Sequence, residues 1–139
     1  MRLGREWSVA ALAVAIAGCG LIPTQANPML PGTQWRVTAV DGEAVVGTEV
    51  IVTVLADAVT VSTSCGASIG DIVKNEGQSF EVAPLEGPGA GPMCPPAALR
   101  THERVAEALA TVDRWAPAGD ATELVGEHTV RIQPQHTDS

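Results

Sequence analysis

Aromatic and basic side chains are both scarce in this sequence. Its 139 residues include three tryptophans, one phenylalanine and no tyrosine, so a core must be built mainly from β-branched and small apolar side chains. Eight lysine and arginine residues stand against sixteen acidic ones, which gives a formal net charge of -8. A surface of this sign repels phosphate backbones, and no basic cluster offsets it. We therefore expect no nucleic-acid binding.

The apolar run from Ser8 to Gly18 is too short for a membrane-spanning helix, which takes about 20 residues. It follows two arginines, Arg2 and Arg5, and ends in small residues. A basic start, a short apolar stretch and small residues before a cleavage point are the three parts of an export signal. We therefore predict a signal peptide over residues 1–18.

The end of this run resembles the bacterial lipobox, with Ile16, Ala17, Gly18 and then Cys19. The resemblance implies cleavage before Cys19, a thioether diacylglyceryl group on its thiol, palmitate on the same residue, and a lipid anchor on the extracytoplasmic side of the cell membrane or cell envelope. The alternatives are an ordinary secretion signal or a buried apolar helix. Residues 19–31 contain three prolines and are predicted to form an extended, lipidated tether.

The body of the chain, residues 32–133, predicts a mainly β (α+β) domain. Fourteen glycines and ten prolines mark frequent turns between about seven short strands, among them residues 50–55 and 59–63. The alternation in residues 32–40 places Trp35, Val37 and Ala39 on one face. Residues 134–139 are expected to be a disordered tail.

One helix is expected near residues 97–113, where apolar positions recur every three or four residues after Pro95 and Pro96 and continue to Val112. His102 lies on this apolar stripe, so we expect it to be a core or boundary residue. The stretch before it is rich in glycine and proline and therefore predicts a loop. This loop is the candidate binding loop of the chain; its residues of interest are Gly87, Pro88, Gly91, Pro92 and Met93.

Three cysteines in an exported protein would leave one thiol unpaired. Lipid modification of Cys19 removes that oddity and leaves Cys65 and Cys94 to pair in an oxidising compartment. Their bridge would close a loop of about 30 residues, which the chain-entropy model values at roughly 3–4 kcal/mol. A redox-active pair is the rival interpretation, but such pairs usually stand as Cys-x-x-Cys.

The same residues resemble the META/HslJ-like (DUF306-type) domain of bacterial lipoproteins. The similarity rests on Gly32-Thr33-x-Trp35, Ser64-Cys65-Gly66, Met93-Cys94, and Glu103 followed by Ala108-Leu109, over residues 32–132. Ser64, Gly66 and the missing residue between Met93 and Cys94 depart from the family pattern. The resemblance implies an antiparallel, partly open β-barrel with one packed helix, and a link to envelope stress or antibiotic tolerance.

No catalytic constellation is visible in the sequence. His102, His128 and His136 lack metal-ligand spacing, and no nucleophile elbow or phosphate loop is present. We therefore expect no enzyme activity, no cofactor and no metal, but a monomeric binding module whose partners are the membrane, through its anchor, and an envelope protein or small apolar ligand. The alternatives are a protease-inhibitor-like module and, less favoured, a thiol-disulfide or hydrolytic enzyme.

Overall fold

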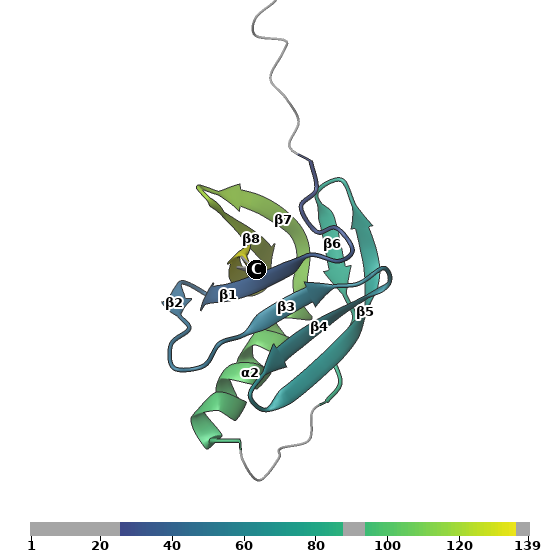
Figure 1. The fold of residues 1–139 in the computed structure, drawn as a ribbon. Coiled ribbons are helices and arrows are strands. Elements are labelled where there is room, and N and C mark those ends of the chain that lie inside the picture. Colours follow the sequence, from purple (N-terminus) through teal and green to yellow (C-terminus); the bar gives the residue numbers. More distant parts are fainter. Residues whose placement is uncertain (1–25, 88–93, 136–139) are drawn as a thin grey trace, which may run out of the picture.

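The computed structural model describes residues 26–87 and 94–135 of the chain. Within them an antiparallel sheet curls into a barrel, and one helix lies across its end (Figure 1). The elements are β1 (Gln34–Val40), β2 (Glu43–Ala44), β3 (Ile51–Val54), β4 (Ala58–Thr63), β5 (Gly66–Glu76), β6 (Ser79–Val82), α2 (Pro96–Leu109), β7 (Val112–Ala118), β8 (Ala121–Gly126) and β9 (Thr129–Pro134).

The barrel is closed because β1 pairs with β9 as well as with β3. Eight strands form the ring, and the short β2 is an extra strand on β1. The predicted β-barrel with one packed helix is confirmed, although the ring is closed and not partly open. The shortest strand pairing in the ring is that between β6 and β7, where Ser79 pairs with Arg114.

A bulge in β1 corrects one detail of the predicted strand. The register against β9 shifts between Val37 and Ala39, so the alternation of inward side chains changes phase there. Val40 is consequently buried at 1% exposure, whereas Ala39 is only half-buried. The prediction that Ala39 shares the buried face of Trp35 and Val37 is therefore wrong.

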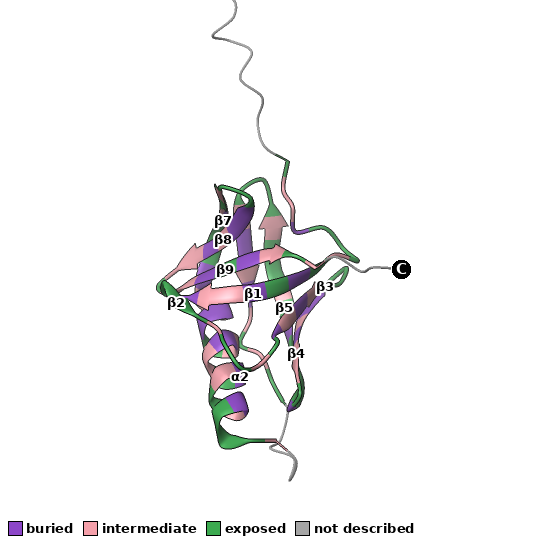
Figure 2. Ribbon diagram, turned by 60° about the vertical axis from the view of Figure 1, so that its left-hand side comes forward, coloured by how far each residue is buried: buried purple, intermediate pink, exposed green. Residues whose placement is uncertain are grey.

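Helix α2 ends earlier than its sequence pattern predicts. Both the backbone N–H and the hydroxyl of Thr111 donate to the carbonyl of Ala108, and this closes the last turn. Val112 then enters β7 instead of extending the helix. The helix buries its inner face against the barrel and exposes the opposite side (Figure 2). His102, Val105 and Leu109 lie on the buried face, as their spacing predicts.

Small β-branched residues fill most of the barrel, as the shortage of aromatics requires. Both tryptophans of the described chain are core anchors with satisfied indoles. Trp35 is 6% exposed and donates to Thr33 Oγ1 at 3.0 Å; Trp115 is 2% exposed and donates to the Gly77 carbonyl at 2.7 Å. These hydrogen bonds fix the indole rings in the core.

Both ends of the folded unit extend beyond the boundaries predicted from the sequence. Met29, from the predicted tether, is fully buried in the barrel core. At the other end Pro134 belongs to β9, and the Gln135 N–H donates to the Gln34 carbonyl at 3.0 Å. The barrel therefore includes the last part of the predicted tether and the first part of the predicted tail.

Candidate functional site

The predicted disulfide is present at the helix-bearing end of the barrel. Cys65, in the turn between β4 and β5, is bonded to Cys94, just before α2, with their Cα atoms 5.0 Å apart. Cys65 is 8% exposed and Cys94 is half-buried. The bond therefore ties the start of the helix to a barrel turn.

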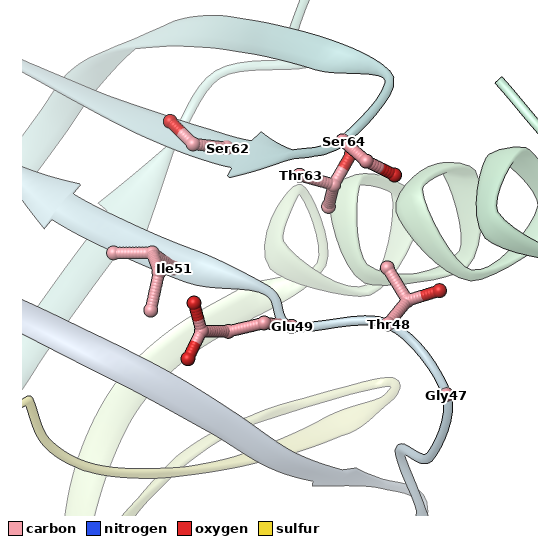
Figure 3. A pocket seen from close by; sticks show the side chains of 7 residues that line it. All are labelled: Gly47, Thr48, Glu49, Ile51, Ser62, Thr63 and Ser64. Carbon is pink, nitrogen blue, oxygen red and sulfur yellow. The ribbon is translucent and has the colours of Figure 1, made fainter. Parts of the chain in front are cut away.

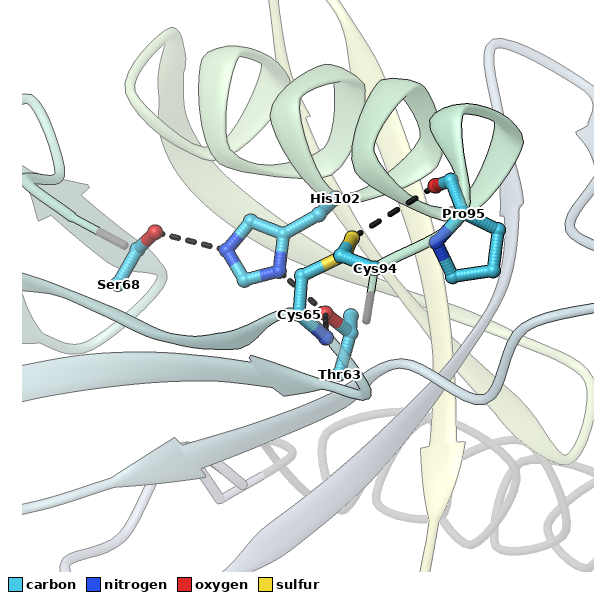
Figure 4. The surroundings of a disulfide bond; sticks show 6 residues. All are labelled: Thr63, Cys65, Ser68, Cys94, Pro95 and His102. Atoms are coloured by element: carbon cyan, nitrogen blue, oxygen red, sulfur yellow. Dashed lines mark hydrogen bonds between the residues drawn. A yellow bond between two sulfur atoms is a disulfide. The ribbon is translucent and has the colours of Figure 1, made fainter. Parts of the chain in front are cut away.

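A buried histidine reinforces this junction (Figure 4). His102 on α2 is 1% exposed, and its ring lies between Thr63 of β4 and Ser68 of β5. Nδ1 is 2.6 Å from Thr63 Oγ1, and Nε2 is 2.7 Å from Ser68 Oγ. Thr63 also accepts the Cys65 backbone N–H at 3.1 Å, which links this network to the disulfide.

The hydroxyl partners determine which ring nitrogen carries the proton. Ser68 donates its hydroxyl proton to the carbonyl of Gly87, so it must accept from Nε2–H of His102. Nδ1 then accepts the proton of Thr63, whose oxygen accepts from Cys65 N–H. Every donor has an acceptor in this arrangement, which requires a neutral, Nε2-protonated imidazole.

Burial favours the same state. It lowers the pKa of His102 below its usual 6.5, while the Glu103 carboxylate opposes the shift. A serine hydrogen-bonded to a histidine can be an activated nucleophile. Here Ser68 is fully buried and its proton is directed at Gly87, so the chemistry of this pair is that of a structural clamp.

A hollow of about 260 Å³ opens beside this network. Ser68 and His102 form its buried polar part, whereas Glu103 and Glu107 are exposed. Within the part of the chain that the structure describes, neither glutamate forms an ion pair. The rest of the hollow has an apolar wall, which comprises Pro84, Leu85, Ala106 and Ala110. The hollow thus combines an apolar wall with an acidic rim.

A second hollow, of about 410 Å³, lies at the same end of the barrel (Figure 3). The loop before β3 contributes Gly47, Thr48 and Glu49, and the end of β4 contributes Ser62 and Thr63. Because Thr63 also belongs to the His102 network, the two hollows flank a single rigid junction. Hydroxyls and one carboxylate line it together with the side chain of Ile51, so it offers hydrogen bonds as well as apolar contact.

An ionic cluster stands nearby, between α2 and two strand turns. Asp41, at φ 51°, accepts the Thr129 N–H and lies 2.8 Å from Nδ1 of His128. These two hydrogen bonds hold the pKa of Asp41 below its usual 3.8. Arg104 of α2 pairs with Glu43 and donates to the Val40 carbonyl at 3.0 Å. The cluster holds the helix against the β1–β2 turn.

The predicted site residues differ in what the structure shows of them. Gly87 is exposed and anchored through its carbonyl by Ser68. Pro88, Gly91, Pro92 and Met93 lie outside the described residues, as do the lipobox residues Ile16, Ala17, Gly18 and Cys19. The roles of Thr63 and Ser68 were not predicted, since neither residue belongs to a motif and no spacing relates them to His102. Only the fold brings them to His102.

Known proteins provide no further guide to the site. No family model, curated protein or solved structure matches the chain. Among residues 26–87 and 94–135, no group of three or more His, Cys, Asp and Glu side chains is arranged to hold a metal ion. No helix in those same ranges is long and apolar enough to cross a membrane. The function must therefore be argued from the contacts described above.

Proposed function

We propose that the chain is a META/HslJ-like lipoprotein of the bacterial cell envelope, a non-enzymatic binding module held by lipid on Cys19. The family resemblance implies a barrel with one packed helix, and the fold has this architecture, although its ring is closed. The Cys65–Cys94 bond uses the two cysteines that remain once Cys19 is lipidated. A link to envelope stress or antibiotic tolerance belongs to the same proposal.

The motif residues behind the resemblance have structural roles that support it. Thr33 accepts from the Trp35 indole and donates to the Leu30 carbonyl at 2.6 Å, so it fixes the start of β1. Cys65 forms the bridge, and Ala108 and Leu109 bury the end of α2. These motif residues therefore stabilise the barrel. We expect a partner to bind to other residues, on the barrel surface.

The observation that carries the binding role is the rigid junction between two hollows. The disulfide and the His102 network hold α2, β4 and β5 together at one end of the barrel. A preorganised surface loses little conformational freedom on binding. A protein segment with an apolar side chain beside a basic one would match the lining around Leu85 and the exposed carboxylates of Glu103 and Glu107.

Site-specific photo-crosslinking in the intact envelope tests this role. A photoreactive residue at Thr48 or Glu103 would report the two hollows, and one at the exposed Asp120 would serve as the control on the far β7–β8 turn. We expect one discrete crosslinked species from a hollow and none from Asp120. Equal crosslinking at all three positions, or at none, would contradict a binding surface here.

A protease-inhibitor-like function is the second candidate, because both stems of the predicted binding loop are held. Gly87 is anchored by Ser68 and Cys94 by the disulfide. Inhibitory loops gain affinity when their stems are fixed before binding. Slow cleavage of the chain between Gly87 and Cys94, together with tight inhibition of a serine protease, would favour this function. Rapid cleavage without inhibition would exclude it.

A further inference from the structure

The segment that leads into the barrel is fixed to one end of it. The Asn27 side-chain amide donates to Asn75 Oδ1 at 2.7 Å, and Asn75 in turn donates to the Met29 carbonyl at 2.8 Å. Met29 is fully buried, and Gly32 N–H donates to the Val54 carbonyl at 2.7 Å. The chain therefore joins the barrel at the end opposite the disulfide, where β3 and β5 finish (Figure 1).

Three exposed apolar side chains lie at this same end. Leu30 is 56% exposed, Leu55 is 39% exposed and Val73 is 65% exposed. Each is a near neighbour in sequence of a residue that holds the incoming segment. These three residues form what we name the tether-end patch. They make up most of the large exposed apolar side chains of the described chain, the others being Val46 and Ile69.

We infer that the tether-end patch rests on the surface of the lipid bilayer that holds the anchor. This inference depends on the proposed lipidation of Cys19. Seven residues lie between Cys19 and Asn27, and the eight steps from one Cα atom to the next span at most about 30 Å. The anchored end of the barrel is thus the end nearest the membrane. The exposed leucines and valine at this end can therefore contact the apolar part of the bilayer.

Apolar contact, and not charge, accounts for this docking. The sequence has a formal net charge of -8, which opposes adhesion to anionic lipid. Asp57 and Glu76 are exposed near the patch, and Lys74, the only lysine of the sequence, is the one basic residue beside Val73. Docking on zwitterionic lipid is therefore insensitive to salt. It directs the two hollows at the disulfide end away from the bilayer.

Methyl NMR on the full protein tests the orientation. The protein is extracted in detergent, its acylation is read from the intact mass, and it is reconstituted into phosphatidylcholine nanodiscs with a gadolinium-chelating headgroup lipid. We expect loss of the Leu30, Leu55 and Val73 methyl signals. The control signal is Val46, which is 78% exposed near the opposite end and should persist.

A second measurement uses the single lysine. A fluorophore on Lys74 should transfer energy to headgroup-labelled lipid more efficiently than one on the double variant K74R/E49K, in which the lysine is moved to the disulfide end. An acylated protein whose patch signals persist, or whose two fluorophores transfer equally, would overturn the orientation while the lipoprotein assignment stands. An unacylated protein would overturn both.

Discussion

Nε2 of His102 lies 2.7 Å from Oγ of Ser68, although the two residues are 34 positions apart in the sequence. This contact joins α2 to β5, and the contact of the same ring with Thr63 joins α2 to β4. One imidazole therefore connects three elements beside the disulfide.

Replacing His102 with alanine should lower the free energy of unfolding by about 2–4 kcal/mol. The change leaves a cavity and removes the hydrogen-bond partners of Thr63 and Ser68. Urea unfolding under non-reducing conditions measures it. Arg100→Ala, at an exposed position of the same helix, is the matched control and should change stability little. Equal effects of the two variants would contradict a clamp at His102.

Stability should also fall with acidification because of His102. Its folded-state pKa is lowered, so the unfolded chain binds the proton more readily than the folded one. The stabilisation is complete above pH 6.5 and is lost as pH falls from there towards the lowered pKa. Urea midpoints across this range measure the loss, and His102→Gln should flatten the curve. Nitrogen-15 shifts of the ring should report Nε2–H.

Asp41 should affect stability in a separate, more acidic pH range. Its pKa is lowered below 3.8, so its contribution is present above that value and disappears as pH falls through the folded-state pKa. Asp41→Asn, made in the His102→Gln background, should therefore reduce the acid sensitivity that remains below pH 4. An unchanged acid limb in Asp41→Asn would show that the carboxylate does not contribute.

Removing the disulfide should destabilise the domain by about 3–4 kcal/mol on the chain-entropy model. The double variant C65A/C94A avoids a free thiol, and its unfolding midpoint in urea gives the loss. Hydrogen exchange should rise first in the opening turn of α2, because Cys94 is covalently tied there. Unchanged exchange at Ala98 and Leu99 would contradict the role assigned to the bond.

The incoming segment provides a matched pair of neighbours. Met29→Ala should cost about 2–5 kcal/mol, since a fully buried side chain is truncated. Leu30→Ala should cost much less, because Leu30 is 56% exposed. Thermal or urea unfolding measures both. Similar stabilities of the two variants would mean that the segment before β1 does not belong to the folded unit.

Gly126→Ala should destabilise the domain by about 1–3 kcal/mol. A Cβ at this position would collide with the backbone of Thr111 and Val112, where the chain leaves α2 and enters β7. Neither backbone segment can move without disturbing the strand pairing. Glu127→Ala, next in the same turn and exposed, is the control. A fully stable Gly126→Ala would contradict this close approach.

Much of the fold could be predicted because it depends on local patterns. The alternation around Trp35 and the three-to-four spacing around Val105 mark elements that the structure contains. The predictions are wrong where contacts between distant parts of the sequence determine the local structure. Ala39 is only half-buried because the pairing of β1 with β9 introduces a bulge before it. Val112 lies in β7 and not in the helix, because the hydrogen bonds of Thr111 end the helix before it.

The candidate site divides in the same way. Cysteine counting predicted the Cys65–Cys94 pair, because two thiols remain when Cys19 is set aside. The position of His102 on the apolar stripe predicted its burial. Its partners Thr63 and Ser68 are ordinary hydroxyl residues on separate strands, and no spacing relates them to the helix. The burial of Met29 could not be predicted either, since the proline-rich sequence around it is typical of a linker.

The most direct test of the account is the intact mass of the protein extracted in detergent from its native envelope, under non-reducing conditions. We predict a chain that begins at Cys19, carries lipid on that residue, and is two hydrogens lighter than its reduced form because Cys65 and Cys94 are bonded. A chain that retains residues before Cys19, or that lacks lipid, would contradict the proposal of a membrane-anchored binding module.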